Sequence, residues 1–306
     1  MATTSIEWTR GTDGTPGVAW NPTTGCDQVS PGCDHCYALA MAKRLKGMGS
    51  GKYQRDGDSR TSGPGFGVTM HPDVVDAPLR WRKPRRVFVN SMSDLFHQDV
   101  TDSFVAEVFV VMAMARQHTF QILTKRHARM RALLSSPRWI VLCDEAQSRV
   151  INRIPSGPLR RQKERQWWRE ITGPLPNVWL GVSVENQKWA DIRIPALLDT
   201  PAVVRFVSAE PLLGPVRLRF SQCREHDFPG GGMCTFSCPG RTRLHWVITG
   251  GESGPGARPV DLGWVRSIRD QCGKSGVAFF HKQHGGIRPK SGGRELDGRT
   301  WDDMPT

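Results

Sequence analysis

The feature that most constrains the fold is a repeat of short apolar runs, most of which are followed by a helical pattern. The runs are rich in β-branched and aromatic residues and lack strict alternation, which is typical of parallel strands buried on both faces. They lie at residues 85–94, 118–126, 177–186, 202–214, 244–254 and 277–286. Helical patterns lie between them at residues 102–117, 127–136, 187–199 and 261–276. The sequence therefore predicts an α/β fold.

About six or seven β/α units most naturally form a partial or full (β/α) barrel, and a doubly wound open sheet is the alternative. We expect one barrel domain over residues 1–306. Stretches outside the repeat are expected to be loop insertions at about 139–172 and 221–243 and an irregular tail at 287–306. The tail should fold back only if Leu296, Trp301 and Met304 find apolar cover.

In both architectures the functional side chains gather at the carboxyl ends of the strands. The residues at these ends are Ser91, Ser93, Asp94, Thr124, Lys125, Arg126, Ser183, Glu185, Asn186, Ser208, Glu210, Gly250, Gly251, Glu252, Lys282 and Gln283. We expect them to face one bowl. Each carboxylate or lysine has an alternative role in an internal salt bridge that holds strand ends together.

The chain is strongly basic, with 42 Lys and Arg against 29 Asp and Glu and a net charge of +13. This charge favours an anionic partner, nucleic acid first, although a solvated basic surface explains it equally well. Basic segments lie at residues 80–86 and 160–168, and the second ends in Trp167 and Trp168. Cations beside aromatic rings are the combination that contacts phosphates and stacks on bases.

No apolar run is long enough for a membrane span, and the N-terminus lacks the apolar stretch of a signal peptide. We therefore expect a cytoplasmic protein without a membrane partner. In that reducing compartment the eight cysteines indicate metal binding or catalysis rather than disulfides.

Three cysteines crowd into the segment NPTTGCDQVSPGCDHCYA, where Cys26, Cys33 and Cys36 have the spacing C-x6-C-x2-C. A strand and turn precede them and a helical pattern follows, so they lie on the loop between the first strand and the first helix. Three thiolates can hold three irons of a [4Fe-4S] cluster and leave the fourth iron open to a ligand. A zinc site completed by a distant Cys or His is the alternative.

A second group contains Cys223, His226, Cys234 and Cys238. Three thiols and an imidazole separated by Gly and Pro turns can close a tetrahedral zinc site and staple a loop that lacks a core. An auxiliary iron–sulfur cluster and free thiols are the alternatives. Cys143 and Cys272 have no neighbours of metal-binding type in the sequence.

The first cysteine loop resembles the cluster loop of radical S-adenosylmethionine (radical SAM) enzymes. Their usual spacing is C-x3-C-x2-C with an aromatic residue before the last cysteine, a place that His35 takes here, whereas the first gap is longer in this chain. The resemblance implies that the open iron binds the amine and carboxylate of S-adenosylmethionine. Electron transfer would then cleave this molecule to a 5'-deoxyadenosyl radical.

A resemblance over nearly the whole chain is carried by WNPTTGC, PLRWRKPRRVFVNSMSDLFH, VWLGVSVEN, RFVSAEPLLGPV, WVITGGESGPGARP, WVRSIRDQC and GGRELDGRTWDDMP. Together they look like a phage and prophage family of unknown function described as three-Cys-motif, radical-SAM-like proteins. This resemblance implies membership and supplies no reaction.

Within the radical SAM resemblance, several strand-end residues become candidate contacts for S-adenosylmethionine. Ser91, Ser93 and Asp94 are candidates for its amine, Lys125 or Arg126 for its carboxylate, Glu185 and Asn186 for its ribose, and Glu210 for a further contact. Gly250, Gly251 and Glu252 match a Gly-Gly-Glu motif of these enzymes but follow a late strand, so that role is not transferred.

The main hypothesis is a radical SAM-like iron–sulfur enzyme that acts on an unknown substrate, with nucleic acid as a candidate. It would need an electron donor, and a separately encoded protein could complete its site. The alternative is a metal-containing nucleic-acid-binding or partner-binding protein without radical chemistry, which predicts salt-dependent binding. A zinc-dependent hydrolase ranks lower because no His-rich ligand set lies at the strand ends.

Overall fold

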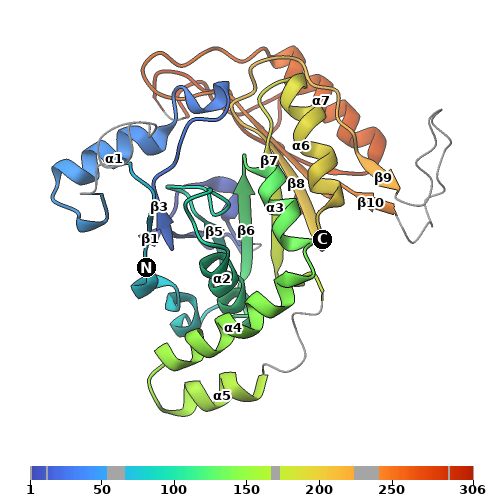
Figure 1. Cartoon of the computed structure of the whole chain (residues 1–306). Coiled ribbons are helices and arrows are strands. Elements are labelled where there is room, and N and C mark those ends of the chain that lie inside the picture. Colours follow the sequence, from blue (N-terminus) through green and yellow to red (C-terminus); the bar gives the residue numbers. More distant parts are fainter. Residues whose placement is uncertain are drawn as a thin grey trace. The chain divides into compact units, whose positions relative to one another are not determined.

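The computed structural model confirms the α/β fold and the partial (β/α) barrel. Its helices and strands are labelled in Figure 1. It describes residues 2–11, 13–53, 66–166, 173–223, 241–288 and 290–305. The strand order in the main sheet is β1-β2-β5-β6-β7-β8-β11-β12, and the seven strands after β1 are parallel. All six apolar runs singled out in the sequence contain one of these strands.

The chain forms two compact units, of which the first spans Met1–Trp179 and Pro201–Val203. Its strands are β1 (Ala2–Thr3), β2 (Val18–Trp20), β3 (Thr23–Thr24), β4 (Thr69–Met70), β5 (Arg86–Val89) and β6 (Thr119–Thr124). Its helices are α1 (Tyr37–Gly47), α2 (Asp102–Met114), α3 (His127–Leu134), α4 (Arg138–Arg153) and α5 (Pro158–Gln166). Short 3-10 turns are η1 (Glu7–Thr9), η2 (Pro31–Cys33), η3 (Gly51–Tyr53), η4 (Pro72–Val74) and η5 (Ala77–Arg80).

The second unit spans Leu180–Thr200 and Val204–Thr306. Its strands are β7 (Val178–Ser183, whose first two residues belong to the first unit), β8 (Val204–Ala209), β9 (Ser221–Cys223), β10 (Arg241–Arg243), β11 (Trp246–Gly250) and β12 (Ala278–Gln283). Its helices are α6 (Gln187–Asp199) and α7 (Leu262–Ser275). Strand β11 pairs in parallel with β8 on one side and β12 on the other.

Local sequence signals explain where several helices begin and end. The Thr101 hydroxyl accepts a hydrogen bond from Phe104 N at the start of α2, and Asp261 caps α7 in the same way through Gly263 N. Helix α7 ends at Gly276, whose φ of +61° is the left-handed conformation that glycine adopts at little cost. Since α2 is buried along nearly its whole length, its apolar sequence reflects a core helix.

The expected insertion at 139–172 contains helix α4, which has a buried apolar face and a charged edge. Trp139, Leu142 and Val150 are among its buried residues, at helical spacing. Arg149 lies 2.7 Å from a carboxylate oxygen of Glu107 on α2, so an ion pair links the two helices. This part of the stretch is therefore part of the first unit's core, whereas Trp167 and Trp168 lie outside the described residues.

The C-terminal tail folds back onto β12, as expected if its apolar residues find cover. Leu296 is buried, and the Trp301 ring lies 5.8 Å from that of Phe279. An antiparallel bridge joins Phe280 to Asp302, which places the tail beside the last strand in the sheet order. Among the helices that the structure describes, every one is too short or too polar to pass through a bilayer.

Candidate metal centre

The loop that carries the three cysteines is anchored to the end of β5. Gly25 N donates to Met92 O over 3.0 Å, and Gly25 forms a parallel bridge with Ser93. Cys26 N donates to Phe66 O over 3.2 Å. Backbone hydrogen bonds on both sides therefore fix the position of Cys26.

Gly25 is required by the geometry of this anchor. Its φ is +88°, and a Cβ on it would lie 2.2 Å from Gly67 O. Side chains are excluded both by the left-handed backbone and by the approach of the neighbouring chain. The glycine before Cys26 thus lets the cysteine loop pass close to residues 66 and 67.

Cys33 and Cys36 lie on consecutive turns that lead into α1. Cys33 N donates to Ser30 O over 2.8 Å, and Cys36 N donates to Cys33 O over 3.2 Å. Cys36 is the N-cap residue of α1, so the helix starts directly at the last cysteine.

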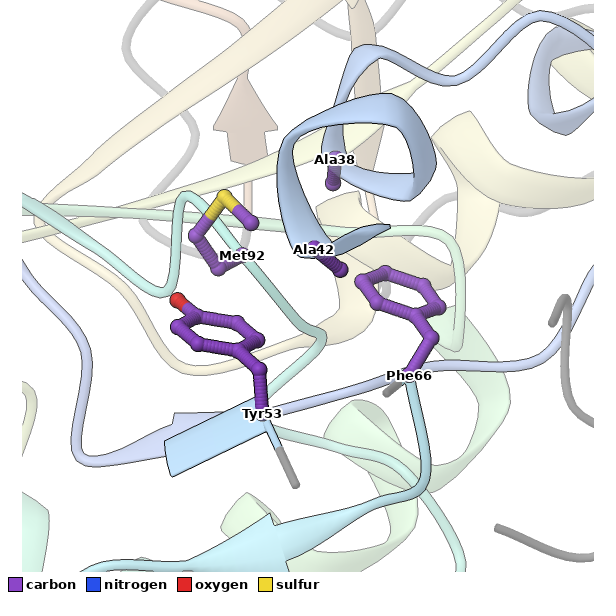
Figure 2. Close-up of a cluster of buried hydrophobic side chains, with 5 residues drawn as sticks. All are labelled: Ala38, Ala42, Tyr53, Phe66 and Met92. Carbon is purple, nitrogen blue, oxygen red and sulfur yellow. The ribbon is translucent and has the colours of Figure 1, made fainter. Parts of the chain in front are cut away.

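The inner face of α1 is fixed by a small apolar cluster (Figure 2). The cluster consists of Ala38, Ala42, Tyr53, Phe66 and Met92, with Cys26, Cys36, Leu39 and Leu45 packed against it. These residues come from α1, from η3, and from the segments that hold Gly25 and Cys26. The first and last cysteines thus share one packed frame.

All three thiols are free and half-buried. Burial raises the pKa of Cys26 to about 12, with a contribution from the charge of Asp94, while the positive charge of Arg126 opposes the rise. Burial also raises the pKa of Cys36, and Lys125 opposes that rise. The charge of Cys33 acts on both groups, so the three thiols are electrostatic neighbours, and binding a metal here would release their protons.

Within the described ranges, no three His, Cys, Asp or Glu side chains are close enough together to hold a single metal ion. A four-iron cluster is wider than one ion and takes its thiolate ligands from its corners. The donor chemistry of Cys26, Cys33 and Cys36 fits such a cluster, because soft thiolates are the ligands that iron–sulfur clusters take from proteins.

A buried polar network lies beside Cys26. His97 is fully buried, and its Nε2 lies 2.9 Å from Asp27 Oδ2. Arg126 Nη2 lies 3.9 Å from the same oxygen. Two buried nitrogens of Arg126, Nε and Nη2, have no hydrogen-bond partner in the described part of the chain. A guanidinium with unused donors next to a thiol is suited to an anionic group.

Ser91 and Ser93 tie the cysteine loop to the end of β5. Ser91 Oγ donates to Asn21 Oδ1 over 3.2 Å, and Ser93 Oγ donates to Thr23 O over 2.9 Å. Tyr37, the first residue of α1, donates from its hydroxyl to Ser91 O over 2.5 Å. Both predicted residues therefore lie at the candidate centre and hold its frame.

Asp94 lies near Cys26 but is engaged by the protein itself. Its carboxylate accepts hydrogen bonds from the Thr124 hydroxyl at 2.7 and 2.9 Å, from Lys125 N at 2.9 Å and from Phe96 N at 3.0 Å. The carboxylate joins the ends of β5 and β6 and keeps Lys125 next to the cysteines. A direct contact with a ligand amine would compete with these bonds.

The strand-end carboxylates of the second unit form internal ion pairs. Glu185 and Arg193 are both fully buried, with Arg193 Nη1 at 3.0 Å from Glu185 Oε2. Glu210 Oε1 lies 3.0 Å from Lys282 Nζ, and Glu252 pairs with Arg258 at 2.7 Å. For these carboxylates the structure shows the salt bridges that were the alternative to ligand contacts.

One glycine and one asparagine at the strand ends of this unit also have structural roles. A Cβ on Gly250 would lie 2.6 Å from Glu210 Oε1, so this glycine leaves room for the carboxylate. Asn186 is the N-cap of α6 and accepts from Trp189 N over 3.4 Å. The structure thus uses Asn186 to start a helix.

The second cysteine group lies mostly outside the described residues. The structure pairs Cys223 with Arg241 in the two-stranded ladder of β9 and β10, and it does not describe His226, Cys234 or Cys238. Cys143 and Cys272 are fully buried, which is typical of cysteines that serve as small core residues. In the basic segment at 80–86, two cations have internal partners: Arg80 pairs with Asp76 at 2.5 Å, and Arg86 Nη1 donates to Arg10 O over 2.7 Å.

A family model described as "Protein of unknown function (DUF5131)" matches residues 3–305. The chain belongs to this family. Neither the curated proteins nor the solved structures gave a match. The description of the DUF5131 family names no reaction, so phage origin and kinship with radical SAM enzymes remain predictions for this DUF5131 protein.

Sequence reasoning missed Asp27 and His97 as parts of the centre. Both residues lie close to segments that the sequence analysis singled out, since Asp27 follows Cys26 and His97 lies three residues after Asp94. The only sequence signal for their role was that each is a polar residue close to a motif. The contact between Asp27 and His97 could not be predicted, because it joins two loops that are 70 residues apart in the sequence.

Proposed function

We propose that this DUF5131 protein is an iron–sulfur enzyme of the radical SAM type, in which Cys26, Cys33 and Cys36 hold a [4Fe-4S] cluster. The observation that carries the proposal is three free thiols on one anchored loop, at the start of a parallel β/α repeat and next to two cations. When bound, such a cluster supplies an open iron for S-adenosylmethionine and the electron for its reductive cleavage.

The cations beside the cysteines support this proposal. A [4Fe-4S] core together with three thiolate ligands carries a net negative charge, which is costly in a half-buried site without compensation. Lys125 and Arg126 follow β6 directly, and their charges act on Cys36 and Cys26. Arg126 also has unused donors for an anion such as the carboxylate of S-adenosylmethionine.

The protein's own residues would hold this site in place before any ligand binds. Asp94 fixes the backbone at Lys125, and His97 fixes Asp27 next to Cys26. Ser91 and Ser93 hold the preceding loop against the end of β5. Preorganised polar groups of this kind reduce the cost of placing a charged ligand.

The test is anaerobic reconstitution with iron and sulfide, followed by iron analysis and electron paramagnetic resonance of the reduced protein with and without S-adenosylmethionine. We expect a [4Fe-4S] signal that shifts when S-adenosylmethionine is added, together with formation of 5'-deoxyadenosine. Cys33→Ala should lose the cluster. Cys143→Ala, which removes a buried thiol elsewhere in the same unit, should keep it.

An unchanged iron content in Cys33→Ala would contradict the proposal. So would a protein that takes up zinc without iron, or a cluster that is indifferent to S-adenosylmethionine. These results would favour the alternative of a nucleic-acid-binding or partner-binding protein, which would then be tested by salt-dependent binding of DNA and RNA.

We also propose a structural zinc ion at Cys223, His226, Cys234 and Cys238, on their sequence spacing. Metal analysis of Cys234→Ala should show loss of zinc with unchanged cluster iron. Loss of iron instead would indicate an auxiliary cluster.

A further inference from the structure

Two basic segments that are far apart in the sequence meet at one end of the first unit. The segment at 80–86 leads into β5, and the second segment begins in α5. Lys163 in α5 donates from Nζ to Met114 O at the end of α2. In the turn after α2, Gln117 donates from Nε2 to Trp81 O over 3.1 Å. The end of α2 and the turn after it thus contact both segments.

His118 lies where the two segments converge. Its Nε2 lies 3.2 Å from Pro78 O, and its ring lies 5.6 Å from that of Trp81. Burial lowers the pKa of His118, and the charges of Arg85 and Lys163 add to this effect. One imidazole is therefore close to cations of both segments, a proximity that the sequence does not indicate.

This basic end of the unit is the amino end of its strands. Arg86 is the first residue of β5, and its register partner is Thr119 at the start of β6. Arg86 Nη1 also donates to Arg10 O, which brings the N-terminal segment to the same end. The candidate cluster lies at the other end, where Gly25 forms a bridge with Ser93 after β5. In β/α barrels the reacting groups gather at the carboxyl ends of the strands, so cations at the amino ends are suited to binding rather than to the reaction.

Several cations at the amino end are exposed and come from separate segments of the chain. They are Arg10, Arg82, Lys83 and Arg116. Arg80 is left out because it pairs with an aspartate. Arg85 and Arg86 are left out because the charge of Asp13 acts on both. Residues 77–93 contain no Asp or Glu, so this stretch adds no opposing charge to the exposed cations.

The composition of this surface favours nucleic acid over a protein. Of the large apolar side chains that are exposed in the described ranges, none belongs to residues 77–86 or 115–119, whereas the centre of a protein interface is apolar. A membrane surface is disfavoured for the same reason, because interfacial binding needs apolar side chains that enter the lipid. Arginine predominates among the cations, and its planar guanidinium binds phosphate through paired hydrogen bonds. A polar and strongly positive surface is typical of proteins that bind nucleic acids.

We propose that the surface formed by Arg10, Arg82, Lys83 and Arg116 binds the phosphodiester backbone of a nucleic acid. Contacts with the backbone do not read the base sequence, so binding should depend strongly on salt and little on sequence. This binding role does not require a cluster. It holds equally for the proposed enzyme and for a protein without radical chemistry.

The test is fluorescence anisotropy with short labelled oligonucleotides of single-stranded RNA, single-stranded DNA and duplex DNA, between about 50 and about 200 mM salt. Arg82→Gln combined with Lys83→Gln should weaken binding at least about fivefold and reduce the slope of log affinity against log salt by about two. The control is Lys43→Gln with Arg44→Gln, which also removes one lysine and one arginine, adjacent and exposed, from α1 of the same unit. It should leave binding nearly unchanged. Arg116→Gln, in the turn after α2, should lower the slope by about one.

Equal losses in the two double variants would overturn the proposal, because they would show that only the net charge matters. A lack of binding to all three oligonucleotides would overturn it as well. Poly-glutamate is the further probe. If it binds as tightly as the oligonucleotides and loses affinity in the Arg82 and Lys83 variant, the surface recognises acidic protein and the proposal fails. Binding of only one kind of oligonucleotide supports the proposal and identifies the nucleic acid.

Thermal unfolding of each variant checks that it is folded, and iron analysis after reconstitution separates this surface from the candidate cluster. The Arg82 and Lys83 variant should keep the iron content of the unaltered protein, because the cysteine loop lies at the other end of β5. Loss of iron together with loss of binding in this variant would overturn the assignment of a separate surface. If the unaltered protein assembles no cluster, the proposed function fails, and the anisotropy measurements still decide whether nucleic acid binds here.

Discussion

His97 Nε2 lies 2.9 Å from Asp27 Oδ2, and this contact joins the residue after Cys26 to the loop after β5. Asp99 N donates to His97 Nδ1 over 3.2 Å, so Nδ1 is the accepting nitrogen of the ring and Nε2 is the one that donates to Asp27. Two loops that are distant in sequence are thereby held at the candidate cluster by one fully buried side chain.

His97→Ala should destabilise the protein by about 2 to 4 kcal/mol, because it leaves a cavity and removes the donor of Asp27. The cysteine loop should loosen as well, so reconstituted protein should contain less iron. Urea unfolding and iron analysis measure the two effects. Asp27→Asn is the matched variant, since its amide oxygen can still accept from Nε2, and it should lose less. Normal stability and iron content in His97→Ala would contradict this account.

Gly25→Ala should cost at least about 1 kcal/mol and displace Cys26, because the new Cβ meets Gly67 O and the backbone is left-handed. Thermal unfolding and iron content provide the readouts. In Gly47→Ala nothing lies within 4 Å of the added carbon, and alanine favours a helix end that glycine weakens. That control should be neutral or slightly more stable, and a similar loss in both variants would argue against the anchor.

Glu185→Ala should destabilise the second unit by about 3 to 5 kcal/mol, because it leaves the Arg193 charge buried without its carboxylate. Replacing both residues with methionine should recover much of this loss, since no charge then remains to be desolvated. Urea unfolding of Glu185→Met, Arg193→Met and the double variant gives the coupling energy. If Glu185 instead binds a ligand, the double variant would be stable but would lose affinity for S-adenosylmethionine in a calorimetric titration.

Acid should destabilise the protein through His245. Burial, followed by the charges of Arg243 and Arg205, lowers the pKa of His245 from 6.5 to about 4. The unfolded chain then binds the proton first, so this contribution to stability is complete above pH 6.5 and is lost as the pH falls towards 4. The loss amounts to about 1 to 3 kcal/mol.

Urea midpoints at pH 7 and pH 5 measure this effect. His245→Gln should show a smaller drop between the two values, because the amide does not titrate and its oxygen can accept from Arg205 N as Nδ1 does. Burial also lowers the pKa of His281, to about 3, and that contribution should persist in the variant. An identical drop in both proteins would show that His245 does not contribute.

The β/α pattern was predictable because it depends on local features of the sequence. Each parallel strand is an apolar run such as β6, and helices such as α7 carry their own caps, as at Asp261 and Gly276. The position of the three cysteines before a helix was equally local, and α1 confirms it.

The roles of the strand-end residues were less predictable, because they depend on partners brought in by the fold. From the sequence alone, Glu185 and Asp94 are both possible ligand contacts. In the structure, Glu185 forms an ion pair with Arg193 on α6, and Asp94 accepts a hydrogen bond from Thr124. Carboxylates at strand ends look the same in sequence whether they bind a ligand or a neighbouring side chain.

The bridge between Phe280 and Asp302 has a consequence for self-association. Strand β12 is the last in the sheet order, and an uncovered outer strand offers its backbone to any other extended chain. The returning tail occupies part of that edge, and Trp246 Nε1 fastens it by donating to Asp303 O over 2.8 Å. We therefore expect the tail, whose residues belong to no regular element, to protect this edge from pairing with strands of other molecules.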